Sequence, residues 1–459
     1  MAQHLLERRL SLGQASAINM IDMVGIGPFI TLPMVISMMN GPYFLYAWVA
    51  GGVLSFLDAM IWSELGAAFP MAGGSYNFLK EAYGKKSAGK MMSFLFVWQT
   101  MIQAPLVIAS AAIGFAKYFS YLFPLTLFWE KVVSGTVVVL IIILLYRKIG
   151  AIGKISVFLW SGVIITLFWI IGGGLVHGNF LAPIKSINSG LHLDYGFVAA
   201  IGFASVKSVY SYLGYYNVCH LGSEIKNPEK NIPRSMFISI AGIGLLYFLM
   251  NVSVASVIPW QNAMHSKYIV SEFIQIIAGG TAAKIATCLI LWVAFASVFS
   301  ATLGYSRIPY AAADDGEFFS IFSKLHPTKH FPYVSLLFLG GIAFVFSIEF
   351  NADLGKVISA ILAMRIIIQF IGQAVGLIVM RTRRKEVGFP FKMPLFPLPV
   401  ILAIGMWLFI LISTGSHLMD WALVIIVSGI VVYFVKARLG REWPFQNEVV
   451  KVEPGYEDD

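Results

Sequence analysis

The chain has 459 residues, 58% of them hydrophobic and 12% charged, and a formal net charge of +9. Soluble domains carry about 25% charged residues, so this composition excludes a soluble domain, and the mean hydropathy of +0.79 indicates a membrane protein. The two cysteines, Cys219 and Cys288, lie in apolar runs and give no disulfide framework.

Long apolar segments follow one another along the chain. A helix needs about 20 residues to cross about 30 Å of hydrocarbon, and the segments lack the two-residue alternation of membrane β-strands. The first segment has no small-residue cleavage pattern, so we expect it to remain in the mature protein. Hydropathy predicts an all-α membrane protein with twelve transmembrane helices, at residues 12–38, 43–68, 91–120, 131–147, 155–176, 196–221, 235–258, 280–311, 331–348, 354–380, 396–415 and 418–436.

Lysine and arginine residues predict the orientation of these helices. If the N-terminus is cytoplasmic, most of the 32 basic residues fall in the inner loops and termini, in agreement with the positive-inside rule. The basic residues on the outer side are Lys117, Lys131, Lys185, Lys267, Lys284 and Lys356. We therefore expect a multi-pass protein in the lipid bilayer of the cytoplasmic membrane, with both termini cytoplasmic and no nucleic-acid partner. Residues 441–459 are predicted to form an acidic cytoplasmic tail.

Two of the predicted helices contain residues that interrupt helical structure. The run from Gly25 to Pro28 stands in the first helix, where two glycines and a proline favour a break between half-helices at 12–24 and 28–38. The run from Tyr210 to Gly214 is a second candidate break, in the sixth helix. Unwound backbone in a membrane lines a polar cavity or a ligand, although glycine also serves close helix packing. Breaks in the first and sixth helices are typical of an inverted five-plus-five repeat.

Groups of polar, glycine and proline residues recur near the ends of the predicted helices. They are Gly25-Ile26-Gly27-Pro28-Phe29, Trp62-Ser63-Glu64-Leu65-Gly66, Asn227-Pro228 with Asn231-Ile232-Pro233, Ser306-Arg307 with Asp315-Gly316, and Phe391-Lys392-Met393-Pro394-Leu395. In this order they resemble the motifs of the amino acid–polyamine–organocation permeases. The resemblance extends from residue 18 to about residue 400.

The resemblance implies a LeuT-type fold in a single transporter domain that covers residues 1–459. Residues 1–176 and 196–380 would be the two inverted repeats, and 396–436 would hold helices 11 and 12. It further implies a secondary active transporter, a symporter or an exchanger, that moves amino acids by alternating access without a cofactor. The loop at 121–130 lacks the cysteine that tethers a heavy-chain subunit in the animal exchangers, so no such partner is implied.

The interrupted first helix offers a site for a small-molecule substrate. Free N–H groups at the start of a half-helix suit a carboxylate. Ile26 and Gly27 are the predicted donors, because Pro28 has no N–H.

The resemblance also assigns roles to residues beside the two breaks. The carbonyls of Met23, Tyr210 and Ser211 would bind the substrate ammonium, and the ring of Tyr210 would close over the substrate. The alternative for Tyr210 is a packing or lipid-facing side chain. The predicted substrate-binding residues are Met23, Gly25, Ile26, Gly27, Tyr210, Ser211 and Gly214.

Asp22, Lys207 and Arg365 lie at similar depth in three predicted helices. Ionisable groups near the midplane cost several kcal/mol unless they are paired or hydrated, which makes them functional candidates. We predict that Asp22 takes up a coupling proton or helps to bind a sodium ion, with Lys207 or Arg365 as alternating partners. Ser297 and Ser300 are candidates for further oxygen ligands. The alternative is a permanent ion pair that only joins two helices.

Other functions have weaker support in the sequence. A carrier of polyamines or other organic cations would need a second carboxylate in the cavity, and a transport-dead sensor on the same scaffold would need a signalling domain. No enzyme and no metal site are predicted. Residues 150–155 lack the spacing of a phosphate-binding loop, and Pro327 lies between His326 and His330.

Overall fold

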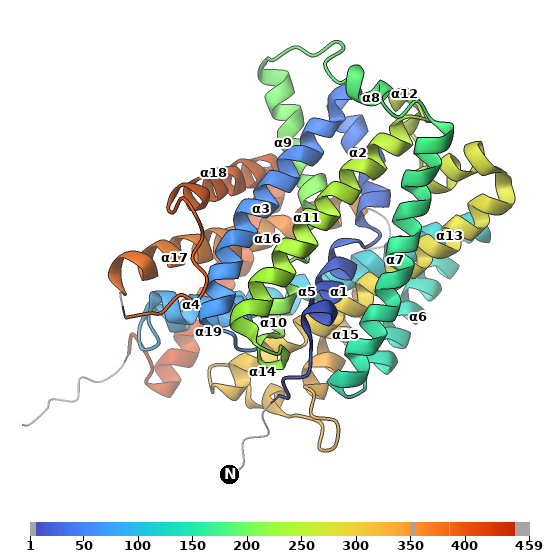
Figure 1. The fold of residues 1–459 in the computed structure, drawn as a ribbon. Helices are drawn as coiled ribbons and strands as arrows, with labels where there is room; N and C mark the ends of the chain where they lie inside the picture. The colour runs from blue at the N-terminus through green and yellow to red at the C-terminus, as the bar shows by residue number, and fades with distance from the viewer. Residues whose placement is uncertain (1–5, 350–353, 385, 446–459) are drawn as a thin grey trace, which may run out of the picture.

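The computed structural model describes residues 6–349, 354–384 and 386–445. Within these ranges the chain forms a bundle of helices with two isolated β-bridges and no strand (Figure 1). Each of the twelve predicted ranges contains a helix or an interrupted helix. Residues 446–459, which make up most of the predicted acidic tail, lie outside the described residues.

The described chain contains eight helical segments that are long and apolar enough to cross a membrane, or up to nine if the bent pair α1 and α2 is one span. Two shorter apolar helices, α15 and α18, accompany them. The protein is therefore a multi-pass membrane protein, as predicted. The main helices are α1 (Leu12–Met23), α2 (Gly27–Met39), α3 (Leu45–Ala68), α5 (Ala88–Leu122), α6 (Leu127–Leu145), α7 (Ile149–His177), α9 (Tyr195–Tyr212), α11 (Pro228–Ala255), α13 (Ile269–Tyr305), α15 (Tyr333–Glu349), α16 (Leu354–Arg365), α17 (Gly372–Arg383), α18 (Leu398–Ser413) and α19 (Ser416–Gly440).

The break in the first helix lies where the sequence predicts it. A capping box starts α1, in which Gln14 N–H donates to Ser11 Oγ at 3.4 Å and Ser11 N–H donates to Gln14 Oε1 at 3.0 Å. The helix ends at Met23, and α2 begins at Gly27 with Pro28 in its first turn. The axes of α1 and α2 differ by 41°.

The sixth predicted helix is also interrupted, and this prediction is confirmed as well. Helix α9 ends at Tyr212, and the short helix α10 (Asn217–His220) follows after four residues without helical structure. Gly214 lies in this gap with φ +119°, a conformation that side chains with a Cβ rarely adopt. Both breaks therefore follow from the glycine and proline content of the chain.

Several helices differ from their predicted ranges, and α7 and α11 begin earlier than predicted, at Ile149 and Pro228. Helix α13 begins at Ile269, not near residue 280, and it bends at Gly279, where φ is +84°. The tenth predicted helix contains a π-helical turn at Ile366–Ile371, between α16 and α17. Such turns often occur at functional sites, and hydropathy does not detect them.

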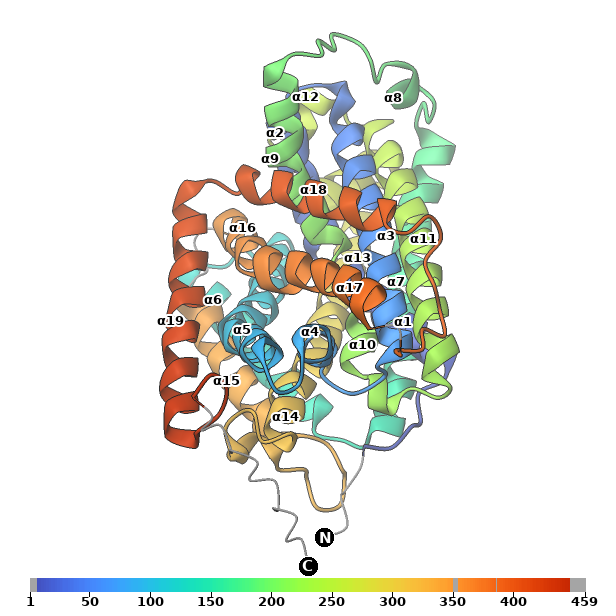
Figure 2. The ribbon, with the colours of Figure 1, turned by 90° about the vertical axis from the view of Figure 1, so that its left-hand side faces the viewer.

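Helices at corresponding places in the two halves of the chain pack against each other. Helix α2 contacts α9, α3 contacts α11, α5 contacts α13, and α6 contacts α15. The buried apolar side chains of both halves form one large cluster. In Figure 2, α17 and α18 run across the bundle beside α3, whereas α19 stands at its edge.

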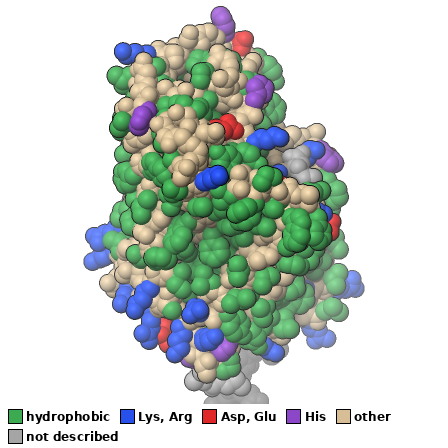
Figure 3. Space-filling view, turned by 90° about the vertical axis from the view of Figure 1, so that its right-hand side faces the viewer, with side chains coloured by type: hydrophobic (Ala, Val, Ile, Leu, Met, Phe, Trp, Pro, Cys, Tyr) green, Lys and Arg blue, Asp and Glu red, His purple; other side chains and the backbone are tan. Residues whose placement is uncertain are grey.

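Short helices lie at the two ends of the bundle. In Figure 1 the upper end holds α8 (Ala182–Lys185) and α12 (Trp260–Ala263), and α14 (Arg307–Asp314) lies at the lower end. The described chain also begins and ends at the lower end (Figure 2). A broad hydrophobic surface covers the middle of the face shown in Figure 3, and lysine and arginine side chains gather toward its lower end.

Candidate binding site

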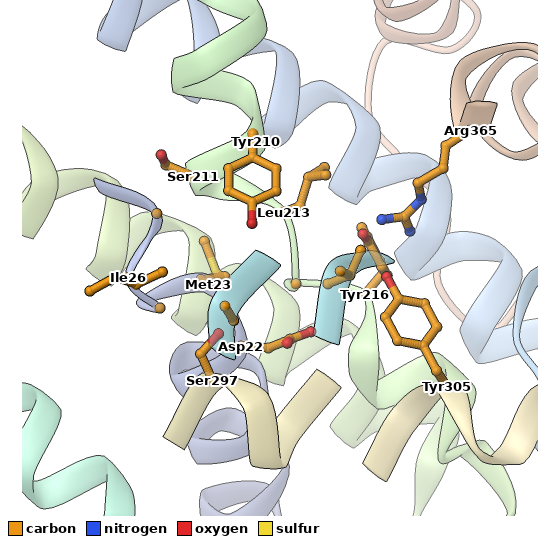
Figure 4. Close-up of a pocket in the computed structure, with 15 residues that line it drawn as sticks. Asp22, Met23, Ile26, Tyr210, Ser211, Leu213, Tyr216, Ser297, Tyr305 and Arg365 are labelled. Atoms are coloured by element: carbon orange, nitrogen blue, oxygen red, sulfur yellow. The ribbon is translucent and has the colours of Figure 1, made fainter. Parts of the chain in front are cut away.

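A pocket lies where the two helix breaks meet, in the middle of the bundle (Figure 4). Its walls come from α1, α2, α5, α9, α13 and α16, and from the backbone of both breaks. All seven predicted substrate-binding residues line it, as do three of the five predicted charge and coupling residues. The lining residues are Asp22, Met23, Gly25, Ile26, Gly27, Val107, Ala111, Tyr210, Ser211, Leu213, Gly214, Tyr216, Ser297, Tyr305 and Arg365.

The backbone of the first break presents unused hydrogen-bond donors to this pocket. Val24 N–H still donates to Met20, which completes the last turn of α1. Within the described residues, the N–H groups of Gly25, Ile26 and Gly27 donate to no acceptor. Donors of this kind at the start of a half-helix form a site for an anion.

A buried tyrosine of α11 joins the two breaks. The hydroxyl of Tyr247 lies 2.7 Å from the carbonyl oxygen of Met23 and 3.1 Å from that of Ser211. The carbonyls of Met23 and Ser211 therefore each retain one free lone pair at most for a substrate cation. Ser211 also contacts α2, because its Oγ lies 2.8 Å from Thr31 Oγ1. No sequence motif distinguishes Tyr247 from the other tyrosines of the chain.

Tyr210 covers the pocket from the side of α9. Its ring lies beside Gly27, so that a Cβ on Gly27 would stand 3.4 Å from Tyr210 Cε1. The hydroxyl of Tyr210 forms a hydrogen bond of 2.8 Å with Ser110 Oγ on α5. The backbone carbonyl of Tyr210, which the resemblance assigns to the substrate ammonium, accepts a hydrogen bond from Leu213 N–H at 3.3 Å.

The pocket contains one acidic and one basic side chain. Asp22 points toward Tyr216, and Arg365 reaches the same region from α16 (Figure 4). Arg365 Nε donates to Gln369 Oε1 at 2.8 Å, and the guanidinium lies over the ring of Tyr216, 4.9 Å from its centre. Within the described residues, no carboxylate lies within ion-pairing distance of Arg365, and its Nη2 has no hydrogen-bond partner. Asp22 and Arg365 therefore form no permanent ion pair in this conformation, which was the alternative to a coupling role for Asp22.

Lys207 does not reach this pocket, although it lies at a similar depth. Its Nζ donates at 2.6 Å both to the carbonyl of Gly355 and to Ser359 Oγ on α16. Lys207 lies one turn nearer the start of α9 than Tyr210 and Ser211, which line the pocket. Lys207 therefore does not pair with Asp22 in this conformation. Contacts with a neighbouring helix hold its ammonium group, and depth in the sequence does not reveal such contacts.

Only one of the two predicted serine ligands lines the pocket. Ser297 lines the pocket beside Gly25. Ser300 lies one turn further along α13, where its Oγ donates to the carbonyl of Ile18 at 2.8 Å and accepts from Asn217 Nδ2 at 3.0 Å. Ser300 thus joins α13 to α1 and α10, and it does not line the pocket. Within the described residues no group of three or more His, Cys, Asp or Glu side chains is placed to hold a metal ion.

Asp58 on α3 is a buried carboxylate near the second break that no sequence motif indicates. It accepts hydrogen bonds from the hydroxyl of Tyr215, in the second break, and from Trp407 Nε1 on α18 at 3.2 Å. Trp407 stacks on Phe370 of the π-helical turn, with ring centres 4.0 Å apart. Asp58 therefore fixes the unwound segment of the sixth helix to its surroundings. Its position inside an apolar run was the signal that would have identified it.

Comparison with known proteins agrees with this architecture. Residues 10–445 match the amino acid permease family. The b(0,+)-type amino acid transporter 1 of Mus musculus is 25% identical over 448 residues, which cover 94% of this chain and 88% of that protein. The serine/threonine exchanger SteT of Bacillus subtilis is 27% identical over 380 residues, which cover 81% and 82% of the two chains. The cystine/glutamate transporter of Homo sapiens is 25% identical over 444 residues, which cover 94% and 85%.

The family match covers nearly the whole described chain, and it includes both breaks and every residue that lines the pocket. The resemblance seen in the sequence motifs is thereby confirmed, and so is the expectation that the protein is a transporter and not an enzyme. The chain belongs to the amino acid permease family.

Proposed function

We propose that this permease is a secondary active transporter, a symporter or an exchanger, that moves amino acids across the cytoplasmic membrane by alternating access. It would have a LeuT-type fold with twelve membrane spans, in which residues 1–176 and 196–380 are inverted repeats and 396–436 form two added helices. Both termini would be cytoplasmic. The pairwise packing of α2 with α9, α3 with α11, α5 with α13 and α6 with α15 supports the repeat.

The observation that carries this proposal is the meeting of two broken helices around one pocket that has free backbone donors. Unwound backbone is stable inside a membrane only where a cavity or a ligand satisfies it. The amides of Gly25, Ile26 and Gly27 would bind the substrate carboxylate. The free lone pairs of the Met23 and Ser211 carbonyls would bind its ammonium.

Asp22 is the proposed coupling group. It is the one acidic side chain in the pocket lining, and it forms no ion pair within the described residues. A carboxylate in this position can take up a proton from one side of the membrane and release it on the other. We propose a proton as the coupling ion, because a carboxylate that lines the pocket without an ion-pair partner in the described chain can take up a proton and release it.

A carrier of polyamines is disfavoured by the same pocket. Its lining contains Arg365, whose positive charge would repel an organic polycation. The buried carboxylate Asp58 does not line the pocket, and Tyr215 and Trp407 donate hydrogen bonds to its oxygens. No tethered partner subunit is proposed, since residues 121–130 contain no cysteine.

The proposal is tested with purified protein in liposomes. Binding is first measured as the thermal shift given by each of the common amino acids, because a ligand at 100 times its dissociation constant stabilises a protein by about 2.7 kcal/mol. Uptake of the best ligand is then compared for exchange and for uphill accumulation under an inward proton gradient. If no amino acid binds or exchanges, the proposed function is wrong.

Asp22→Asn separates coupling from binding. This variant should still exchange the substrate, but it should no longer accumulate it against its gradient. Asp194→Asn is the matched control, because Asp194 lies on the surface and caps α9 through Phe197 N–H, a bond that asparagine can also form. Uphill accumulation by Asp22→Asn would show that another group couples transport.

A further inference from the structure

One nitrogen of the Arg365 guanidinium, Nη2, has no hydrogen-bond partner within the described residues. The side chain is 1% exposed, and its Nε is occupied by Gln369. The rings of Tyr216 and Phe370 lie beside the guanidinium, with centres 4.9 and 5.3 Å from Cζ. Rings stabilise a cation through their faces, but they accept no conventional hydrogen bond from Nη2, which is buried without a partner in the described chain.

An unpaired guanidinium in this place is costly. Removing a charge from water without a hydrogen-bonded counter-ion costs several kcal/mol, and charged side chains inside membranes occur with partners or at sites of function. Ion pairs elsewhere in this protein balance the charge of a buried arginine with a carboxylate, which Arg365 lacks within the described residues. Arg307, for example, is equally buried but makes two hydrogen bonds to the carboxylate of Glu224, at 2.9 and 3.0 Å.

The position of Arg365 relative to the helix breaks defines which part of a substrate it would meet. In Figure 4, Ile26 and Arg365 lie at opposite sides of the pocket, with Asp22 and Tyr216 between them. A substrate whose α-carboxylate binds the amides of the first break therefore directs its side chain toward Arg365. Tyr305 lines the same end of the pocket.

We propose that the substrate is an amino acid with an anionic side chain, a carboxylate or a comparable oxyanion, and that Arg365 binds this group. This inference rests on the proposed function. Arginine binds planar oxyanions through paired N–H donors, and such a group would satisfy Nη2. An apolar side chain would leave Nη2 buried and unsatisfied, and a neutral amide could accept its hydrogen bond but would not balance its charge.

Charge balance in the pocket agrees with this substrate. The titratable groups that line the pocket with Asp22 are Arg365 on α16, Tyr210 on α9, Tyr305 on α13, and Tyr216 in the second break. Arg365 is thus the only cation among the lining residues. The empty pocket, with Asp22 ionised, has no net charge. When Asp22 holds a proton and the substrate brings an anionic side chain, the loaded pocket again has no net charge. A neutral amino acid with the same proton would leave one positive charge in the membrane interior, which is unfavourable.

The test uses pairs of amino acids that have the same shape and differ in side-chain charge. Affinities of the purified wild-type protein are measured for L-glutamate against L-glutamine and for L-aspartate against L-asparagine. The acid of a pair should bind about tenfold tighter or more, as expected for a charge-assisted hydrogen bond to a buried group. Equal affinity within each pair, or tighter binding of the amides, would overturn the inference while leaving amino acid transport intact. Binding of neither acids nor amides, nor of any other amino acid, would instead remove the proposed function.

Variants of Arg365 test whether this residue causes the preference for the acid over the amide. Arg365→Gln should bind the acid and the amide of each pair equally, and Arg365→Lys should keep part of the preference, because it keeps the charge. Arg383→Gln removes an exposed positive charge from α17 and should leave the preference unchanged. An undiminished preference in Arg365→Gln would show that another group of the protein binds the substrate's side chain. If Arg365→Gln does not fold, the wild-type ratios decide the question alone.

Discussion

The glycines of the two breaks differ in what an added side chain would meet. At Gly214, which has φ +119°, a Cβ would stand 2.7 Å from Met23 N and 2.8 Å from the carbonyl carbon of Asp22. Backbone atoms cannot move away as a flexible side chain can. At Gly27 the nearest atoms are Ser211 Oγ and Tyr210 Cε1, both at 3.4 Å, which is close to ordinary contact.

We therefore predict a graded response at these two glycines. Gly27→Ala should retain measurable uptake, and Gly27→Val should abolish it, because the added methyl groups would fill the space beside Tyr210 and the free amides. Gly214→Ala should abolish uptake and also lower the thermal midpoint, since a left-handed alanine costs about 1 kcal/mol or more before any clash. Uptake by each variant is measured at matched amounts of membrane protein. Normal transport by Gly27→Val would show that these amides do not bind the substrate.

Tyr210 provides a second test at the scale of one residue. Its ring lies against the pocket, while its hydroxyl bonds to Ser110, which also donates to the carbonyl of Val107 at 2.8 Å. Tyr210→Phe should therefore keep most of the transport rate, because Ser110 retains a partner. Tyr210→Ala should lose most of it, because the ring area that covers the substrate is gone. Equal rates for the two variants would indicate that the ring has only a packing role.

Between elements, Tyr247 of α11 holds the ends of α1 and α9 together through one hydroxyl. Tyr247→Phe keeps the ring but leaves two buried carbonyls without this donor, so the free energy of unfolding should fall by about 1–3 kcal/mol. Tyr46→Phe removes a hydroxyl that bonds to Asn188 at the surface, and it should have little effect. The two variants are compared by thermal unfolding and by substrate affinity. An unchanged midpoint in Tyr247→Phe would show that water or the substrate replaces the hydroxyl.

The sequence predicts the elements of this protein better than it predicts their contacts. The breaks at Gly25–Pro28 and near Gly214 follow from local backbone chemistry, which glycine and proline reveal directly. The partners of a charged residue depend on helix rotation and packing. Lys207, for example, bonds to Gly355 and Ser359 of α16, whereas Arg365 at the end of the same helix lines the pocket. Tyr247 and the Asp58–Tyr215–Trp407 contacts join helices far apart in sequence, so no local pattern indicates them.

At the scale of the whole molecule, the breaks concentrate the polar chemistry in one place. The paired helices around them are apolar, and α19 faces mostly outward from the bundle. Lys90 of α5 joins Glu317 at 3.0 Å and Glu442 at 3.5 Å, so that the end of the described chain is tied to the same side of the bundle as α14. When the broken helices rock against the rest of the bundle, the pocket closes on one side before it opens on the other. Its charges are then enclosed in the apolar interior. Low net charge in the pocket favours such a motion.

This reasoning predicts that transport of an anionic amino acid is electroneutral. One proton on Asp22 and one anionic side chain at Arg365 add no net charge to the pocket, so the rate of L-glutamate uptake should rise with an inward proton gradient and should not respond to membrane potential. In liposomes, a potassium gradient with valinomycin sets the potential, and a separate buffer gradient sets the proton force. If one net charge moved with the substrate, a potential of 100 mV would supply about 2.3 kcal/mol and accumulation would change about fiftyfold. In Asp22→Asn the proton gradient should have no effect, while exchange of L-glutamate continues. A potential-dependent uptake in the wild-type protein would show that Asp22 and Arg365 do not balance the transported charges.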